Sequence, residues 1–420
     1  MKFSGDKLIV VVDNFELGGV QRVLITLARA LKEAGYPVAV AAFKPRGPLR
    51  NELAGIDVVA IPVVRAGFTS WMRFLSDASL RPWFRKKRIR KVLRYATGLM
   101  SLLKGAHRNV VLSGDMFGNC AVAECQRILG PEVMRSIVSI HSYVMQSEKA
   151  SNDDLGVDGG VEQADVAPSG PWPRDYVRRC LQQVDAVVAV SDGLEAEVSR
   201  LMGSGFPVAR IYDPVITDRL RGLAEDPPSH PWALDKEIPL ILSVGRFGPQ
   251  KDFLALLDAF ALVRSRREAR LMLVGYNTKS RAHRVYKAEL EARAKRLGIA
   301  DSVVMLPVMN NPYALMRAAD LYVLSSPAEG FGNVLVEALH CGLPIVSTDC
   351  PGGPREILDH GKYGLLTPAG DASAMADSII RVLDSPCDSS ELRMRAEMFS
   401  LERSLAGYQD VLERLPPFVT

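Results

Sequence analysis

Short apolar runs alternate with helical patterns along the whole chain, and this alternation restricts the fold more than any other feature. Runs of this kind are typical of strands buried on both faces of a sheet. The apolar face at Val20, Val23, Leu24 and Leu27 shows the helical spacing found between them. The alternation predicts an α/β fold with doubly wound parallel sheets. The predicted strands are 8–12, 38–43, 58–61, 110–112, 136–140, 186–190 and 209–212, followed by 240–244, 271–274, 303–306, 321–324, 345–347 and 365–367.

The two sets of predicted strands are separated by a proline-rich stretch without periodicity at 225–232. A chain of 420 residues is roughly two to three domains long. We therefore expect a Rossmann-like domain at 1–220, a second at 235–390, and a helical tail over 391–420, helical from about 391 to 413, that packs back on the first domain. Ligands in such sheets bind beyond the carboxyl ends of the strands, so the ligand is expected in the cleft between the domains. Residues 151–172, rich in Asp, Gly, Pro and Ser, are predicted to be a mobile loop.

The composition is that of an ordinary globular protein, with 48% hydrophobic and 24% charged residues and a formal charge of +4. The six cysteines form no CxxC pair, and no histidines stand at zinc-ligand spacing, so we expect free thiols and no metal or cofactor. No run approaches the roughly 20 apolar residues that span a bilayer, and the first strand is too short for a signal peptide. These features predict a cytoplasmic location.

The most informative motif, 329–337, falls between a buried strand and a helix. It combines Glu329, glycines at 330 and 332, the N–H groups of a helix start, and Glu337 one turn later. Asn333 and Glu337 are four residues apart and share a helix face. Helix N-termini favour phosphate, and carboxylates accept hydrogen bonds from paired sugar hydroxyls. The motif predicts a sugar-nucleotide site.

A second anion-binding loop follows the first strand of the second domain. Here Gly245, Arg246 and Lys251 precede a helix. Two cations there suit a diphosphate that leaves during a reaction, although they could also be solvated loop charges. Two further turns, 307–313 and 351–357, follow strands of the same domain. The backbone at Val308 and Asn310 is a candidate for reading a nucleobase edge, with a plain turn as the alternative.

In the first domain, Gly18 and Gly19 follow the first strand and open a helix. Paired glycines allow a backbone to approach a phosphate or sugar, and the alternative is a tight turn. The pattern is not GxGxxG, which weakens a nicotinamide-cofactor interpretation. His141, at the end of a predicted strand, is a candidate to bind a hexose hydroxyl, with Asp115 and Asn119 as weaker candidates.

Residues 81–94 contain eight basic residues and no acidic residue, with aromatic residues interleaved. Such a segment suits anionic lipid headgroups. A nucleic-acid patch or a solvated helix face is the alternative. We favour the membrane, with Arg85, Lys86, Lys87 and Arg88 as the contact residues, and expect no nucleic-acid partner.

Taken together, these motifs resemble retaining glycosyltransferase family 4, which has the two-domain GT-B fold. The resemblance covers nearly the whole chain and is strongest from 243 to 368, where 329–338 and 349–358 are specific. The chain looks like bacterial members that build lipid-linked saccharides, exopolysaccharide or lipopolysaccharide. This likeness implies transfer of a hexose or N-acetylhexosamine from a nucleotide sugar, with UDP preferred, to a lipid-linked or saccharide acceptor at the inner face of the cell membrane.

The resemblance also implies roles for individual residues. Arg246 and Lys251 would bind the donor diphosphate, Glu329 the transferred hexose, and Glu337 the ribose. His141 would lie near the C6 hydroxyl, and the first domain would hold the acceptor. The further donor-binding positions are Gly18, Gly19, Gly245, Val308, Asn310, Gly330, Phe331, Gly332, Asn333 and Val334. Attack would occur on the face that the diphosphate leaves, without a metal.

Three other classes remain open on the sequence. A sugar-nucleotide epimerase and a glycogen-type phosphorylase share the fold, but neither suits the combination of Gly18-Gly19 with Glu329 and Glu337. A non-enzymatic membrane- or nucleic-acid-binding protein would use 81–94 and leave the predicted donor site without convergent polar groups.

Overall fold

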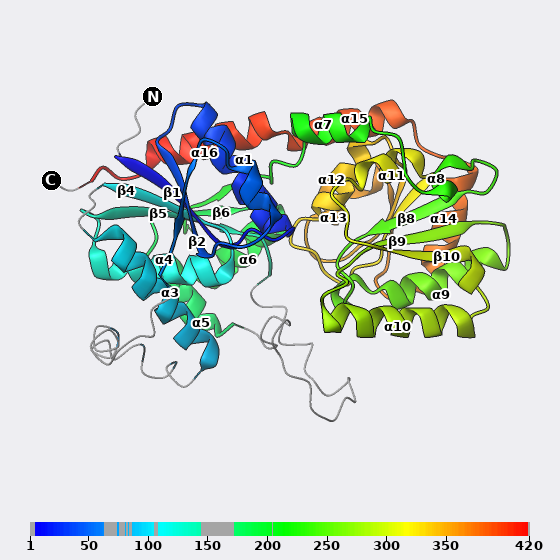
Figure 1. Cartoon of the computed structure of the whole chain (residues 1–420), viewed down its shortest axis with the longest axis horizontal. Helices are drawn as coiled ribbons and strands as arrows, with labels where there is room; N and C mark the ends of the chain where they lie inside the picture. Colours follow the sequence, from blue (N-terminus) through cyan, green and yellow to red (C-terminus); the bar gives the residue numbers. More distant parts are fainter. Residues whose placement is uncertain are drawn as a thin grey trace. The chain divides into compact units, whose positions relative to one another are not determined.

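The structure, a computed structural model, describes residues 5–62, 74, 80, 83, 86–104, 108–143, 172–203 and 205–418. The chain forms two compact units. Described residues before 215 and after 400 belong to unit 1, and residues 215–400 form unit 2. Each unit contains one parallel sheet with helices on both faces (Figure 1). The predicted α/β class with two Rossmann-like sheets is confirmed.

The sheet of unit 1 has seven strands in the order β3-β2-β1-β4-β5-β6-β7. Its strands are β1 (Lys7–Asn14), β2 (Val38–Lys44), β3 (Asp57–Ala60), β4 (Asn109–Ser113), β5 (Met134–Ile140), β6 (Ala186–Ala189) and β7 (Val208–Arg210). Its helices are α1 (Gly19–Glu33), η1 (Pro48–Glu52), α3 (Lys87–Leu103), α4 (Met116–Leu129), α5 (Arg174–Leu181), α6 (Asp192–Met202) and α16 (Leu401–Arg414).

Alternate residues of β1 show why both faces of this sheet are covered. Leu8, Val10 and Val12 lie in a core that also holds buried residues of α1 and α16. Ile9 and Val11 point to the opposite face and are also buried, on the side where α4 contacts the sheet. A strand buried on both faces reads as a continuous apolar run. The carboxyl ends of β1, β2, β4 and β5 therefore meet at one edge of the sheet.

The sheet of unit 2 has six strands in the order β10-β9-β8-β11-β12-β13. They are β8 (Leu240–Val244), β9 (Arg270–Tyr276), β10 (Val303–Pro307), β11 (Leu321–Leu324), β12 (Ile345–Thr348) and β13 (Leu365–Thr367). Its helices are α7 (Asp218–Ala224), α8 (Pro231–Leu234), η5 (Pro249–Lys251), α9 (Phe253–Arg264), α10 (Arg281–Arg296), η6 (Ala300–Ser302), α11 (Tyr313–Ala318), α12 (Asn333–His340), α13 (Pro354–Ile357), η7 (Asp359–Gly361), α14 (Ala372–Asp384), α15 (Ser389–Ala396) and η8 (Glu397–Phe399). Residues of α9, α10 and α14 form a core with one face of the sheet.

The C-terminal part of the chain differs from the single helix expected at 391–413. The structure divides it into α15, the turn η8 and α16, with Ser400 in extended conformation between them. Ser400 forms an isolated parallel bridge with Ile216. The division has a physical reason, because α15 packs on α12 in unit 2, whereas α16 packs on α1 in unit 1.

Candidate functional site

Two loops of unit 2 meet beyond the carboxyl ends of β8 and β11. The loop after β8 carries Lys251, and the loop after β11 carries Glu329. The Lys251 ammonium group donates to Glu329 Oε1 at 2.5 Å, and Ser326 Oγ donates to the same oxygen at 2.6 Å. The Lys251 and Glu329 side chains are only 17% and 14% exposed. The structure thus joins two motifs that sequence analysis found separately into one charged pair.

Buried groups of β11 and its following turn hold the Lys251 loop in place. Ser325 Oγ donates to the Lys251 carbonyl at 2.7 Å. Tyr322, fully buried, donates its hydroxyl to the Val244 carbonyl at 3.0 Å at the end of β8. A Cβ atom at Gly245 would lie 3.0 Å from Lys251 Cε, so the lysine stem crosses this glycine. Gly245 therefore provides the room through which Lys251 reaches Glu329.

A glycine turn between β12 and α13 packs against the backbone of the Glu329 loop. The Glu329 N–H donates to the Pro351 carbonyl at 3.1 Å. Gly352 has a φ of 117°, and a Cβ there would lie 1.7 Å from the Glu329 carbonyl oxygen. A Cβ at Gly353 would lie 2.0 Å from the Phe331 carbonyl oxygen. Side chains are excluded at both positions because backbone packs directly on backbone. Gly330 lies between these two contacts.

Helix α12 begins beside the Lys251–Glu329 pair, at the carboxyl edge of the sheet. Its N-cap residue Gly332 has a left-handed φ of 101° and has no side chain of its own to cap the helix. Asn333 and Val334 form its first turn and are partly exposed. Helix N-termini carry partial positive charge and favour anions. One turn later, the Tyr313 hydroxyl donates to Glu337 Oε1 at 3.3 Å.

The other predicted donor residues of unit 2 lie on exposed loops. Arg246 is exposed and acts on His283, where burial lowers the pKa of the imidazole and the Arg246 charge lowers it further. Val308 is 46% exposed, and its N–H donates to the Tyr276 carbonyl at 2.9 Å. Asn310 is exposed beside it. The N–H of Val308 is thus already used within the protein.

In unit 1, the predicted glycine turn opens helix α1. Gly18 is its N-cap in extended conformation, with a φ of −119°. A Cβ on Gly18 would meet only the movable end of Gln21 at 2.2 Å, and a Cβ on Gly19 would meet nothing within 4 Å. The space above Gly19 is therefore not filled by the described parts of the chain.

His141 lies at the end of β5, as expected, but its imidazole is engaged within unit 1. Its Nδ1 is 3.2 Å from Asp213 Oδ1, and the side chains are 4% and 5% exposed. Its Nε2 is 2.8 Å from Ser139 Oγ. A contact with a sugar hydroxyl requires the ring to give up the Ser139 bond. Asn119 is also engaged, because Ser113 Oγ donates to its Oδ1 at 2.7 Å and its Nδ2 donates to the Ser139 carbonyl at 2.8 Å.

Two carboxylates at the carboxyl edge of this sheet have pKa values shifted in opposite directions. Burial alone would raise the pKa of Asp13, but the Tyr95 hydroxyl, which donates to it at 2.7 Å, and the Lys44 charge bring its pKa below the usual value. Asp115 caps α4 by accepting from the Gly118 N–H at 3.0 Å. Burial raises the pKa of Asp115. Asp13 is therefore held as an anion, whereas the charged form of Asp115 is disfavoured.

The basic segment lies at the start of α3. Lys86 and Lys87 are exposed, and Arg88 is half-buried. Arg85 lies outside the described residues, as do almost all of 151–172. Within the described part of the chain, no helix is long and apolar enough to cross a membrane, and no three acidic, histidine or cysteine side chains gather as metal ligands.

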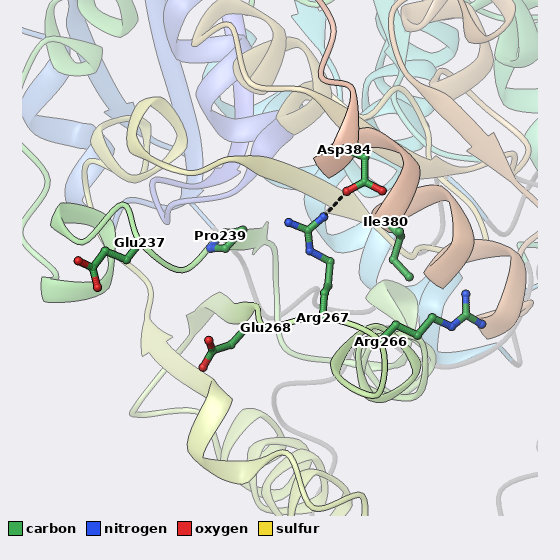
Figure 2. Close-up of a pocket in the computed structure, with 7 residues that line it drawn as sticks. All are labelled: Glu237, Pro239, Arg266, Arg267, Glu268, Ile380 and Asp384. Atoms are coloured by element: carbon green, nitrogen blue, oxygen red, sulfur yellow. Dashed lines mark hydrogen bonds and ion pairs between the residues drawn. The ribbon is translucent and has the colours of Figure 1, made fainter.

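A hollow at the surface of unit 2 lies away from the candidate site (Figure 2). It has a volume of about 480 Å³, and Arg267 pairs with Asp384 across it at 2.6 Å. Pro239 and Glu268 in its lining precede β8 and β9, so it opens at the amino edge of the sheet. Ligands of doubly wound sheets bind at the carboxyl edge. This hollow is therefore distinct from the candidate site.

Comparison with known families agrees with the two-unit architecture. The family model of group 1 glycosyl transferases matches residues 227–399, and the Glycosyltransferase Family 4 model matches residues 17–219. Together the two models match most of the chain, which therefore belongs to the glycosyltransferases that they describe. The Lys251–Glu329 pair and α12 lie in the first matched region, and Gly18, Gly19 and His141 lie in the second.

Its curated relatives are other glycosyltransferases. The N-acetyl-alpha-D-glucosaminyl L-malate synthase of Bacillus anthracis is 27% identical over 59% of this chain and 64% of the relative. An N-acetylgalactosaminyltransferase of Campylobacter jejuni, named for a diphospho-undecaprenol acceptor, is 33% identical over 34% of this chain and 37% of the relative. The matches thus span less than two thirds of these relatives.

Solved GT-B structures match the chain over nearly its full length. The Anabaena HepE protein, in complex with UDP and glucose, gives a TM-score of 0.68 at 18% identity and covers 97% of this chain and 98% of its own. Sucrose-phosphate synthase from Thermosynechococcus elongatus gives 0.70 at 18% identity, covering 96% and 98%. At this identity the likeness concerns the fold.

Several residues that shape this glycosyltransferase site were not found from the sequence. Ser326 and Tyr313 bind the two glutamates, and Asp213 holds His141. Ser326 lies three residues before Glu329, Tyr313 ends the predicted turn 307–313, and Asp213 directly follows the predicted strand 209–212, but nothing in the local sequence identifies the side chain that each one contacts. The turn at 351–357 was recognised from the sequence, but the role of Gly352 and Gly353 as a backbone support for Glu329 depends on tertiary packing.

Proposed function

We propose that this glycosyltransferase is a retaining enzyme that transfers a hexose or N-acetylhexosamine from a UDP-sugar to a lipid-linked or saccharide acceptor in cell-surface polysaccharide synthesis. The observation that carries the proposal is the Lys251–Glu329 pair beside the start of α12, where the N-cap residue is a glycine. It places a cation, a carboxylate and helix N–H groups at one edge of the sheet. The cation and the helix N–H groups suit a diphosphate, and carboxylates suit the hydroxyl groups of a hexose and a ribose.

The proposed roles follow from this chemistry. Negative charge develops on the departing phosphate, and Lys251, Arg246 and the α12 start stabilise it. Glu329, held by Lys251 and Ser326, orients hydroxyls of the transferred sugar. Glu337, steadied by Tyr313, accepts hydrogen bonds from the ribose. In this proposal the acceptor attacks from the face that the diphosphate leaves, and the stabilising charges come from the protein without a metal ion.

The proposed classes of donor and acceptor are based on the relatives as well as on the geometry of the site. The HepE structure contains UDP and glucose, and the Campylobacter jejuni relative is named for a polyprenyl-diphosphate-linked acceptor. Other relatives are named for malate and inositol phosphate. All of these named acceptors carry an anionic group, a feature that a basic acceptor unit would accommodate.

A panel assay tests the reaction. Purified protein is incubated with UDP- and GDP-linked hexoses and N-acetylhexosamines and with a bacterial lipid extract, and nucleotide release and labelled lipid are measured. We expect UDP release that depends on the extract, with the anomeric configuration of the donor kept in the product. An epimerised sugar nucleotide without transfer, or inverted product, would overturn the proposal. Titration with UDP and GDP separately measures the preferred base.

Association with the inner membrane face is a separate part of the proposal. Lys86 and Lys87 are exposed at the start of α3 and suit anionic headgroups. Reversing both, Lys86→Glu and Lys87→Glu, should release the protein from vesicles that contain phosphatidylglycerol. Unchanged co-sedimentation would exclude this surface. The double variant Arg29→Glu and Lys32→Glu, at two exposed positions of α1, changes the net charge by the same amount and is the matched control.

A further inference from the structure

Helix α10 of unit 2 has a basic side that none of the proposed donor contacts uses. The helix lies beside α9 (Figure 1), and its residues Tyr286, Leu290 and Ala294 are buried in the core of the unit. Because a helix turns once in 3.6 residues, the opposite side carries residues 281, 285, 288, 292 and 296. With two exposed neighbours they form a surface that we call the outer face of α10, consisting of Arg281, Arg284, Val285, Ala288, Ala292, Lys295 and Arg296. This face contains four cations and no acidic residue.

The cations of α10 differ in whether they have a counter-ion. On the flanks of the helix, Lys287 pairs with Glu291, and Arg293 pairs with Asp258 of α9 at 2.7 Å. The remaining acidic residue of the helix, Glu289, also stands on a flank. On the outer face, no cation lies within ion-pair distance of a carboxylate in the part of the chain that the structure describes. The described residues therefore leave the charge of the outer face without close neutralisation.

Helix stability does not account for the cations at the start of α10. Arg281 and Arg284 lie in its first turn, which has no acidic residue. The N-terminus of a helix carries partial positive charge, so cations there are unfavourable, whereas Lys295 and Arg296 in the last turn are favourable. Arg284 donates to the Thr278 carbonyl at 2.7 Å, but this bond leaves its charge in place. An external anion would stabilise this end of the helix.

The middle of the outer face is apolar and shallow. Val285 is 62% exposed, and the small side chains of Ala288 and Ala292 follow one and two turns later. They allow a flat partner to approach the helix between its two basic ends, which lie roughly 22 Å apart at about 1.5 Å per residue. Cations around an exposed apolar residue suit anionic lipid headgroups. Nucleic acid suits the face less well, because the face has no aromatic side chain on which bases could stack.

We propose that the outer face of α10 docks on an anionic membrane surface, with lipid headgroups on its two basic ends and Val285 at the level of the headgroups. This inference deepens the proposed membrane association, which used Lys86 and Lys87, by giving unit 2 a membrane contact of its own. It rests on the proposed function in taking the membrane as the source of the acceptor. Strand β9 ends at Tyr276 and α10 begins at Arg281, so the start of α10 lies at the carboxyl edge of the sheet. Docking would hold this edge, where the donor is proposed to bind, near the lipid.

Vesicle co-sedimentation tests the outer face directly. The full-length protein is mixed with phosphatidylcholine vesicles that either contain or lack phosphatidylglycerol, and the bound fraction is measured. We expect binding only with phosphatidylglycerol, and binding at least about tenfold weaker for the double variant Arg284→Glu and Lys295→Glu. The matched control is Lys236→Glu with Lys362→Glu, at two exposed lysines elsewhere in unit 2, because it changes the net charge by the same amount. It should bind as the wild type does.

Val285 distinguishes a lipid surface from other anionic partners. Val285→Leu should strengthen vesicle binding and Val285→Asp should weaken it, because the side chain meets the headgroup region. Binding to a labelled oligonucleotide and to labelled polyglutamate is measured in parallel by fluorescence anisotropy. If the variant Arg284→Glu with Lys295→Glu loses binding to either polymer but keeps vesicle binding, the face serves another anionic partner and the proposal is overturned.

The outcomes separate this inference from the proposed function. If the variant Arg284→Glu with Lys295→Glu has the wild-type melting temperature and sediments as the wild type does, the outer face is excluded, whatever Lys86→Glu with Lys87→Glu shows. If the wild type binds no vesicle, both membrane surfaces are excluded, whereas the sugar-nucleotide panel still tests the transferase activity. The α10 variant should bind UDP as the wild type does. Loss of UDP binding would show that the face serves the donor, and would also overturn the proposal.

Discussion

The carboxyl edges of the two sheets are built in different ways. In unit 2 the backbone fixes the edge, because Gly352 and Gly353 pack directly under Glu329 and Phe331 and leave no room for a side chain. In unit 1 the edge is lined by side chains of α3 and α4, with cations over aromatic rings. Backbone packing restricts sequence strongly, whereas side chains can be exchanged without altering the fold. The difference suits an enzyme class in which one unit keeps a common donor and the other adapts to different acceptors.

The largest effect is expected at the charged pair of unit 2. Lys251→Ala should lower kcat about 10²–10³-fold, a loss of about 3–4 kcal/mol, because a charge that stabilises the leaving diphosphate is removed. The measurement is the initial rate of donor turnover with the sugar nucleotide identified by the panel assay. Lys362→Ala, an exposed lysine of the same unit, serves as the control. Turnover within twofold of wild type would remove Lys251 from the mechanism.

Next in size is the backbone contact itself. Gly352 has a φ of 117°, and the Cβ that Gly352→Ala adds would lie 1.7 Å from the Glu329 carbonyl oxygen. We expect a loss of about 2–3 kcal/mol in unfolding free energy, together with impaired turnover, because the Glu329 loop must shift. Gly370→Ala, at a φ of 79° with nothing within 4 Å, controls for left-handed backbone strain alone. Equal destabilisation of both variants would show that the contact contributes nothing beyond the φ angle.

In unit 1, the Tyr95–Asp13 hydrogen bond should contribute less. Tyr95→Phe is expected to cost about 1.5–3 kcal/mol at pH 7, as for a bond to a charged group. Because the pKa of Asp13 is lowered in the folded state, this stability is present above its ordinary value of about 4 and is lost as the pH falls further. Denaturant unfolding of Tyr95→Phe, Asp13→Asn and the double variant, at pH 7 and pH 3, measures the coupling. A coupling that does not weaken between pH 7 and pH 3 contradicts this assignment.

The smallest effect on the fold is expected at Gly19. Alanine there meets no atom of the described chain, so Gly19→Ala should change stability by less than about 0.5 kcal/mol. If the open space accommodates the donor, the KM for the sugar nucleotide should rise while the melting temperature stays constant. An unchanged KM would mean that Gly19 is only a turn residue. Together with Gly352→Ala, this pair separates glycines needed for a ligand from glycines needed for packing.

The sequence predicted the sheets better than it predicted the sites. Each apolar run became a strand at nearly the predicted residues, because strands covered on both faces must be continuously apolar. The break at Ser400 was missed, since residues on both sides of it favour helix and only the partners of α15 and α16 reveal it. Local patterns likewise suggested both Lys251 and Glu329, but not their ion pair, which forms between segments 78 residues apart.

Sequence was least informative about the surroundings of single polar residues in unit 1. His141 was correctly predicted at the end of a strand, but the local sequence did not predict that Asp213 lies beside its ring. The charge of 81–94 was obvious, but its division between exposed and half-buried residues depends on where α3 begins. Helix boundaries are set by tertiary packing as much as by local propensity, so the half-buried position of Arg88 was available only from the structure.

The return of α16 to unit 1 bears on how the protein is made. Tyr408, Val411, Leu412 and Leu415 complete a core to which β1, α1 and β2 contribute most of the other members. On the ribosome these residues emerge after all of unit 2. The half of the protein that is synthesised first therefore cannot close its core until synthesis is almost finished, whereas unit 2 is complete earlier. A released chain that ends at residue 400 should hold a protease-resistant unit 2 beside a still-sensitive unit 1.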